Sequence, residues 1–446
     1  MVATRIGLEV VSQYAMATVR PSWSSELLEF LDACPTPHHA VQQAALRLSR
    51  AGFIALTERE PFHLKRNGRY YYRRGSTLVA FRTGASRVRE RGIRFIGAHT
   101  DSPGLRLKPR LCRTSSAGYA LLDVEIYGNA LLHTWLDRDL AVAGRVLYED
   151  RGRLRSRLVA SSGPVCRVPS LAVHLQPDVN TRGLVVHPHE HLVPVLARSG
   201  GASARALLTR LLAPHGIPVD SVRGHDLRLV STERAVLAGV RNEFVLAARL
   251  DNLAMCHAAL SSLVGLEAGA PWTTAIVLFD HEEVGSESAT GARGSVLRDF
   301  TARLIPDAST RLRALRRSFF LSADMGHAVH PSFPEKHDER HAPVLGDGPL
   351  LKTSANQRYA TSELAAAQLR TLAREAGIPL QEFVPRSDVS CGSTLGPLAA
   401  AELGVRTADI GSPLLSMHSI REMAHERDHA FTCRLLERFF GTPRLG

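Results

Sequence analysis

Four groups of residues combine histidine and acidic side chains at or just beyond the ends of predicted strands. They are His99-Thr-Asp101, Asp251-Asn252, residues 280–286, and residues 324–327 taken together with 417–419. Imidazole and carboxylate groups bind divalent transition metals and move protons. Because open α/β sheets bind ligands beyond the carboxyl ends of their strands, we expect these groups to meet at one edge of a sheet.

The first group pairs His99 with Asp101. Residues i and i+2 on an extended chain point to the same side. Asp101 can therefore accept a hydrogen bond from the ring nitrogen of His99 that does not bind a metal, which fixes the tautomer and orientation of the ring. Pairs at this spacing also occur for purely structural reasons, so the motif alone does not establish a site.

Asp251 lies between a predicted strand over residues 244–248 and a predicted helix over residues 252–266. A carboxylate at this junction can bridge two cations. The alternative is that Asp251 caps the amino terminus of the helix, a position where aspartate is common. The local sequence leaves both interpretations open.

Glu282 and Glu283 follow the most apolar predicted strand, residues 273–279. Two adjacent carboxylates at a buried strand end repel each other and are costly to bury without a cation. With a cation present they can divide the work, because one binds the metal while the other takes a proton from a metal-bound water. This pair is the strongest indication of catalysis among the four groups.

Taken together, the candidate ligands are two imidazoles and three carboxylates. They are His99, Asp251, Glu283, Asp324 and His418. With a bridging aspartate, this set is sufficient for two divalent ions, which lie roughly 3.5–4 Å apart in two-metal sites. A mixed nitrogen and oxygen set suits Zn²⁺, or Mn²⁺ or Co²⁺, better than Mg²⁺.

The predicted strands that carry these groups alternate with predicted helices, especially after residue 239. This alternation predicts an α/β fold with a mostly parallel sheet flanked by helices, in which the last helix runs from Ser419 to about Phe439. The stretch 104–238 has more strand and less helix, so we interpret it as a second, inserted domain. The predicted division is an extension over residues 1–20, a discontinuous domain over 21–103 and 239–446, and the strand-rich insertion 104–238.

The composition is that of a soluble globular protein, with 44% hydrophobic and 22% charged residues among 446. No apolar run reaches the roughly 18–20 residues that a membrane helix needs. The amino terminus lacks the apolar segment and cleavage site of a secretory signal, so we expect a cytoplasmic protein that starts at Met1 or Met16. Six scattered cysteines without a CxxC motif indicate reduced thiols.

The net charge of +12 raises the possibility of nucleic-acid binding. However, all but four of the 55 basic residues are arginines spread along the chain, a pattern that a compositional bias explains. The densest basic patch, residues 66–75, interleaves arginine with tyrosine. We interpret it as a solvated loop or an oligomer surface, with RNA binding as the alternative.

The sequence also contains six ordered motifs. They are HTDSPGLRLKP (99–109), LDN (250–252), DHEEVGSESATGA (280–292), ADMGHAVHP (323–331), ANQRYA (355–360) and GSPLLSMHSIREM (411–423). Together they resemble the M18 family of aspartyl aminopeptidases, over roughly nine-tenths of the chain. Related dinuclear aminopeptidases of the M42 and M28 types share the metal-binding pattern but lack ANQRYA and MHSIREM.

The resemblance implies a role for each candidate residue. His99, Asp251, Glu283, Asp324 and His418 fall on the family's positions for two metal ions, most often Zn²⁺, with Asp251 bridging. Glu282 falls on the general base and Asp101 on the carboxylate behind the first histidine. Lys352 matches the lysine that meets an acidic substrate side chain, where a compact ammonium suits a narrow subsite.

The resemblance also implies a zinc-peptidase domain with an inserted dimerisation domain, and a dodecamer built from dimers. In the family, a histidine in a segment like PSLAVHLQPDVN reaches the active site of a neighbouring subunit. Here that residue is His174. The implied activity is release of aspartate or glutamate from the amino terminus of peptides, without a nucleic-acid or membrane partner.

Two other functions remain as alternatives. The same scaffold could serve a neutral or broad-specificity aminopeptidase, which relative rates on aspartyl and leucyl anilides would distinguish. A non-catalytic assembly or nucleic-acid-binding protein could use the basic surface, but the retained pair Glu282-Glu283 argues against it.

Overall fold

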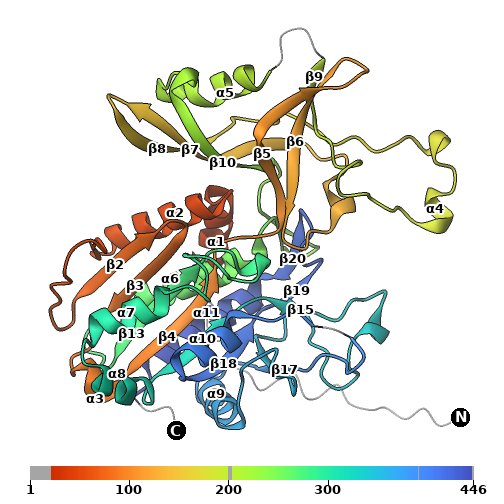
Figure 1. The fold of residues 1–446 in the computed structure, drawn as a ribbon. Coiled ribbons are helices and arrows are strands. Elements are labelled where there is room, and N and C mark those ends of the chain that lie inside the picture. The colour runs from red at the N-terminus through yellow and green to blue at the C-terminus, as the bar shows by residue number, and fades with distance from the viewer. Residues whose placement is uncertain (1–21, 199–202, 390, 444–446) are drawn as a thin grey trace, which may run out of the picture.

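The computed structural model describes residues 22–198, 203–389 and 391–443. The chain forms two bodies, a larger one around a nine-stranded sheet and a smaller one around a six-stranded sheet (Figure 1). Within those three stretches, no helix combines the length and the apolar character needed to span a bilayer. The predicted extension over residues 1–20 lies outside the described residues.

The nine-stranded sheet is the centre of the larger body. Its strands, in spatial order, are β1 (Ile54–Ala55), β2 (Arg69–Arg74), β3 (Thr77–Arg82), β13 (Thr273–Phe279), β4 (Ile93–His99), β14 (Phe319–Ala323), β18 (Arg406–Gly411), β16 (Leu350–Lys352) and β17 (Gln381–Phe383). The central strands β13, β4, β14 and β18 are all parallel to their neighbours in this group. The prediction of a mostly parallel α/β sheet flanked by helices is therefore confirmed.

Helices cover both faces of this sheet. One face carries α1 (Ser22–Ala33), α2 (Pro37–Arg50), α6 (Leu250–Gly265), α9 (Glu363–Glu375) and α11 (Glu426–Gly441), and the other carries α7 (Val296–Leu304), α8 (Ala308–Leu315) and α10 (Leu395–Leu403), with α3 (Val88–Arg91) beside α8. Alternate side chains of each central strand enter the two cores, as Ile276 and Val277 of β13 do. Burial on both faces explains why residues 273–279 are apolar without alternation.

The smaller body is a six-stranded antiparallel sheet with its own hydrophobic core. In spatial order its strands are β8 (Arg153–Ala160), β7 (Leu140–Asp150), β10 (Val222–Ser231), β5 (Gly104–Thr114), β6 (Tyr119–Tyr127) and β9 (Val195–Arg198). Helix α5 (Ala204–Leu212) packs on it, and the short helix α4 (Val179–Arg182) lies on a segment that projects from it (Figure 1). The short 3-10 helices here are η1 (Leu132–Trp135), η2 (Val173–Leu175), η3 (Ala213–His215) and η4 (Val219–Ser221). The assignment of 104–238 as a separate domain stays a prediction.

The larger body also contains a third, five-stranded sheet. It consists of β11 (Val236–Ala238), β12 (Phe244–Ala247), β20 (Glu422–His425), β19 (Pro413–Leu415) and β15 (Gly326–His327). The prediction of a helix starting at Ser419 is wrong, because residues 422–425 pair with β12 and α11 begins only at Glu426. Tertiary pairing overrides the helical spacing of the apolar residues in this stretch.

The arginine- and tyrosine-rich patch is part of the sheet and not a solvated loop. Strand β2 buries Tyr70 and Tyr72 in one core and Tyr71 in the other. Arg74 forms ion pairs with Glu58 and with an aspartate of α7. The three rings are therefore packed in the interior, where they cannot form the exposed platform on which single-stranded nucleic acid stacks.

Candidate active site

The candidate ligands meet at one edge of the nine-stranded sheet, because the strands that precede most of them run in parallel. His99 ends β4, and Glu282 and Glu283 lie in the 3-10 helix η5 (Glu282–Val284) after β13, whose last residue is level with His99. Asp324 follows β14, the neighbour of β4 on its other side. The other two candidates lie beside strands of the third sheet. Asp251 is at the start of α6, which follows β12, and His418 is in the loop between β19 and β20.

Asp251 lies between the two histidines. Its Oδ1 is 3.5 Å from Nε2 of His99, and its Oδ2 is 3.5 Å from Nε2 of His418. His99 Nε2 is also 3.4 Å from Asp324 Oδ1, and His418 Nε2 is 3.3 Å from Glu283 Oε2. The donor atoms thus form two groups that share Asp251, each with one imidazole and a second carboxylate. The amino-terminal cap of α6 is Arg249 and not Asp251, so the capping alternative does not describe this chain.

The chemistry of this cluster fits bound cations. Oδ1 of Asp251 and Oε1 of Glu283 are buried without a hydrogen-bond partner. Burial raises the pKa of Glu283 to about 7 and that of Glu282 well above its usual range. Although burial opposes a charged imidazole, the contacts with Asp251 and Glu283 raise the pKa of His418 to about 11. Carboxylates this close at a buried position need positive charge, which divalent ions supply.

The Asp101 carboxylate is fully buried behind the cluster. Nδ1 of His99 is 3.5 Å from its Oδ1, but a shorter contact of 3.0 Å joins the same nitrogen to the backbone oxygen of Asp101. The carboxylate accepts hydrogen bonds from the backbone N–H groups of Glu282 and Glu283, at 3.2 and 3.1 Å. It also accepts one from the hydroxyl of Tyr127, at 2.7 Å. Asp101 therefore orients the turn that carries both glutamates as well as the first histidine.

Two residues that hold the site were not predicted from the sequence. Glu422 is buried and accepts hydrogen bonds from the backbone N–H groups of His418 and Asp251, at 2.9 and 3.1 Å. It lies within the motif GSPLLSMHSIREM, which was the available signal. Tyr127 gives no such signal, because it lies on β6 of the smaller body, far from Asp101 in the sequence.

The smaller body also contacts the site through its backbone. Nδ1 of His418 lies 2.9 Å from the carbonyl oxygen of Asn129, which leaves Nε2 directed at Asp251 and Glu283. The N–H of Leu131 donates to the carbonyl oxygen of His418 at 2.9 Å. Two short loops, one from each body, therefore fix the orientation of this imidazole.

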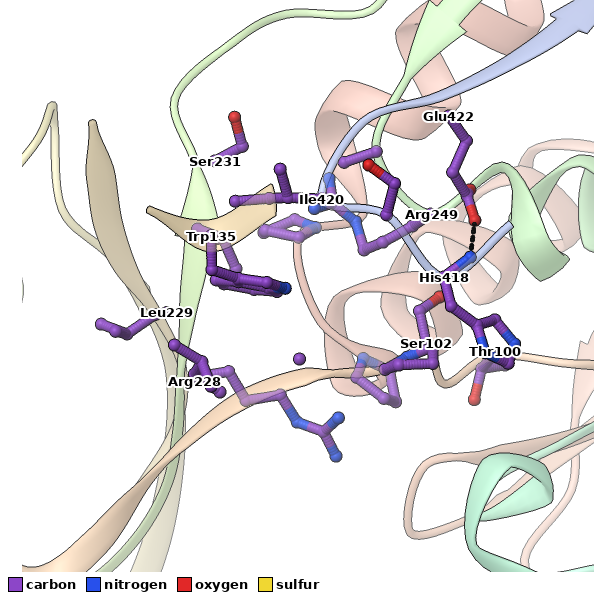
Figure 2. Close-up of a pocket in the computed structure, with 18 residues that line it drawn as sticks. Thr100, Ser102, Trp135, Arg228, Leu229, Ser231, Arg249, His418, Ile420 and Glu422 are labelled. Atoms are coloured by element: carbon purple, nitrogen blue, oxygen red, sulfur yellow. Dashed lines mark hydrogen bonds between the residues drawn. The ribbon is translucent and has the colours of Figure 1, made fainter. Parts of the chain in front are cut away.

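A small cavity of about 40 Å³ lies behind His418, at the junction of the two bodies. Figure 2 shows His418 and Glu422 on one side of it and Trp135 and Arg228 on the other. The guanidinium of Arg228 stacks over the ring of Tyr127, with its carbon 4.2 Å from the ring centroid. Tyr127 is thus held from one side by Arg228 while its hydroxyl bonds to Asp101.

A larger cavity of about 600 Å³ opens in front of the cluster. Its wall includes Lys352, Tyr359 and His327, together with Asn129 of the smaller body's loop. Lys352 is 2% exposed, and its Nζ donates to the carbonyl oxygen of Met325 at 2.6 Å and lies 3.8 Å from Asp324 Oδ2. A buried ammonium therefore faces the same space as the candidate ligands.

His174 does not join this group. It is exposed on η2 of the projecting segment and is not among the residues that line the cavity. The structure thus brings together every predicted site residue except His174, and it presents His174 to the outside of the chain.

Two imidazoles and a set of buried carboxylates at the carboxyl edge of a parallel sheet are the arrangement of a metal-dependent hydrolase, a class that includes aminopeptidases. Comparison with known proteins narrows this class. Residues 30–440 match the M18 peptidase family, described as aminopeptidase I zinc metalloprotease. The chain belongs to this family of metal-dependent aminopeptidases.

Named relatives and solved structures agree with this assignment. A probable M18 family aminopeptidase 2 of Stutzerimonas stutzeri is 44% identical over 96% of this chain and 100% of the relative, and one of Pseudomonas aeruginosa is 43% identical over the same shares. The cryo-EM structure of the Ape4 and Nbr1 complex superimposes with a TM-score of 0.91 at 35% identity, covering 94% of this chain and 85% of that one. The mApe1 dodecamer of S. cerevisiae gives 0.82 at 29% identity, with 94% and 96% covered.

The hydrogen bond from Tyr127 to Asp101 yields the first prediction. Tyr127→Phe should lower kcat about 10–100-fold with little change in KM, because a hydrogen bond to a charged group contributes about 1.5–3 kcal/mol and orients both glutamates through Asp101. Steady-state kinetics at saturating metal measures this. Tyr72→Phe is the matched control, since its hydroxyl is buried without a partner and its loss should leave kcat unchanged. Equal effects of the two substitutions would contradict the proposed role.

Proposed function

We propose that this chain is a dinuclear aminopeptidase that releases aspartate or glutamate from the amino terminus of peptides. The observation that carries the dinuclear part is the position of Asp251, with one carboxylate oxygen toward each histidine. His99 and Asp324 would complete one metal position, and His418 and Glu283 the other. Zn²⁺ is the preferred ion, since the family is described as zinc metalloprotease and the ligands mix nitrogen with oxygen.

When bound, the ions would polarise the scissile carbonyl group and lower the pKa of water at the site. Glu282 is the residue we assign to proton transfer, because its carboxylate is the remaining acid of the group and is 4.0 Å from Nε2 of His99. It takes a proton from the attacking water and delivers it to the leaving amine. Asp101 keeps Glu282 in place by accepting a hydrogen bond from the backbone N–H of Glu282.

Replacement of the general base tests this assignment. Glu282→Gln should lower kcat by about 10²–10⁴-fold while the metal content and the fold stay unchanged, since the amide cannot accept the proton. Metal analysis and steady-state kinetics on an aspartyl anilide measure both effects. Glu287→Gln is the control, because Glu287 is an exposed residue of the same loop. Loss of metal with comparable activity per bound ion would show that the roles of Glu282 and Glu283 are exchanged.

Lys352 supports the choice of acidic substrates. A substrate bound at the metal positions would extend its first side chain into the cavity, where Lys352 is a buried ammonium. Its contact with Asp324 is long, at 3.8 Å, and Tyr359 lies beside it with its ring centroid 5.4 Å from Nζ. A carboxylate of the substrate would add the short charged partner that Lys352 lacks, whereas a neutral side chain would leave the ammonium desolvated.

The specificity prediction uses a neutral side chain of similar length. Lys352→Met should reduce the ratio of kcat/KM on aspartyl and leucyl anilides by at least about thirtyfold, because an unpaired buried charge costs about 2–5 kcal/mol. The loss should fall chiefly on the aspartyl substrate. Lys336→Met, on the surface helix η6 (Pro334–Lys336), is the control. An unchanged ratio would support the alternative of a broad-specificity aminopeptidase.

We further propose that the chain assembles into dimers and a dodecamer through its insertion 104–238, and that His174 serves the active site of a neighbouring subunit. The mApe1 relative is described as a dodecamer. The projecting segment around His174 exposes several large apolar side chains. They are Leu171, Val173, Leu175, Leu184 and Val185, with exposed fractions from 43% to 79%. Apolar surface of this extent favours contact with another protein chain.

Complementation between subunits tests the role of His174. His174→Phe should lower kcat about 10²–10³-fold with metal content and oligomer size unchanged, the typical loss when one hydrogen-bond donor to the developing oxyanion is removed. His189→Phe, an exposed histidine of the same segment, should have no such effect. Mixing His174→Phe chains with Glu282→Gln chains under exchange conditions should restore activity, because a mixed pair contains one intact site. If subunits exchange and activity does not return, His174 does not act across subunits.

A further inference from the structure

A second cluster of metal-binding side chains lies in the interior, between α6 and α11. It consists of His257 on α6 and of His429 and Cys433 on α11. All three are buried, with exposed fractions of 0%, 4% and 0%. His429 and Cys433 are four residues apart, so they lie on the same face of their helix. None of them belongs to the set that forms the candidate active site.

The distances within this cluster are close to the spacing of ligands around one ion, and the three donor atoms all lie within 4.8 Å of one another. Nδ1 of His257 is 3.0 Å from Nε2 of His429, and Nε2 of His429 is 3.5 Å from Sγ of Cys433. Metal–nitrogen and metal–sulfur bonds of about 2.0 and 2.3 Å place two ligands of a tetrahedral Zn²⁺ about 3.3–3.6 Å apart. Small side-chain shifts would therefore bring all three atoms to one ion.

The electrostatic state of the two imidazoles also suits a metal. Burial, with the neighbouring imidazole and Arg47, lowers the pKa of His257 well below its usual value, and burial lowers that of His429 to about 4. Both rings are therefore neutral, the form that binds metals. Burial raises the pKa of the Cys433 thiol, so an ion must displace its proton on binding.

A carboxylate, that of Glu26, lies near the ring nitrogen of His257 that points away from the cluster. Nε2 of His257 is buried without a hydrogen bond, and Oε2 of Glu26 on α1 lies 4.0 Å from it. In metal sites, a carboxylate at the outer nitrogen orients the ligating imidazole. The negative charges of Glu26 and a Cys433 thiolate would together balance a divalent ion, which lowers the cost of burying it.

We propose that His257, His429 and Cys433 bind one further Zn²⁺-class ion, separate from the active site. His257 lies six residues after Asp251, within the same helix α6. The ion would join α6, which carries Asp251 at its start, to α11, which directly follows the strand that carries Glu422. Its role would be to stabilise the contact between two elements that position the active site.

Cobalt substitution distinguishes the two sites, because the proposed ligands of the active site are nitrogen and oxygen atoms only. After removal of metals with a chelator, titration with Co²⁺ should produce a thiolate-to-cobalt charge-transfer band in the near ultraviolet. Cys433→Ser should remove this band and bind one ion fewer per chain. Cys256→Ser should keep it, although the Cys256 thiol contacts the carbonyl oxygen of His99 at 2.9 Å.

The proposal is overturned if Co²⁺ restores turnover without a thiolate band, since the two histidines and the thiol would then be a hydrogen-bonded core cluster. It is also overturned if the band persists in Cys433→Ser. His257→Phe is a second variant, because an aromatic ring beside Phe30 preserves the packing of the helices. It should lose the same ion while its turnover stays close to that of the unchanged chain. Zn²⁺ should raise the Tm of the unchanged chain more than that of this variant.

Discussion

The structure depends on the placement of the Asp251 carboxylate between two imidazoles in a buried, acidic environment. Each oxygen faces one histidine, while Glu283 and Asp324 approach from beyond the ends of β13 and β14, the two strands that flank β4. Burial, with repulsion from the neighbouring carboxylates as a further cause, raises the pKa values of Glu282 and Glu283, so without compensating charge these two acids would tend to take up protons. The fold must therefore hold the acids in position against their own repulsion, and the buried partners of Asp251, His418 and the glutamates do so.

Those partners come from all parts of the chain. Glu422 of the third sheet accepts the backbone N–H groups of both Asp251 and His418, and Asp101 accepts those of Glu282 and Glu283. The smaller body adds the hydroxyl of Tyr127 and a backbone carbonyl to the imidazole of His418. Its contribution to the site is thus direct, and a displacement of the two bodies would disturb the proposed general base Glu282 as well as the candidate ligand His418. Because buried carboxylates hold the backbone beside the candidate site residues, the side chains of these residues have few alternative positions. Such preorganisation is what catalysis requires.

Helices α6 and α11, on one face of the nine-stranded sheet, support the same arrangement of side chains. They pack against each other, α6 carries Asp251 at its start, and α11 directly follows the strand that carries Glu422. The neutral histidine pair between them is a polar feature inside an apolar contact, and polar groups in such places are stable only when they have partners. Nδ1 of His257 and Nε2 of His429 are each other's partners at 3.0 Å, and the proposed ion, bound by these two atoms and Cys433, would strengthen the helix pair that supports the site.

The sequence by itself determined the candidate residues of the site and the class of fold. Polar groups that follow strands of a parallel sheet reach a common edge, so His99, Glu283 and Asp324 could be assembled from the predicted strands. Asp251 was grouped with them because it also follows a predicted strand, although that strand is β12 of the third sheet, and His418 was grouped with them from its motif. The tertiary structure decided which of their neighbours hold them. Tyr127 became visible only when the chain was folded, because no local pattern marks a side chain that bonds to a residue of another element. Glu422 lies within the motif GSPLLSMHSIREM, but only the folded chain shows that it also bonds to the backbone of Asp251, which is far away in the sequence. For the same reason the stretch 422–425 could pass for a helix, whereas pairing with β12 makes it a strand. The spacing of residues in a short stretch determines which face of a strand or helix a side chain lies on. Which residues it contacts on that face depends on long-range pairing, which a short stretch of sequence does not reveal.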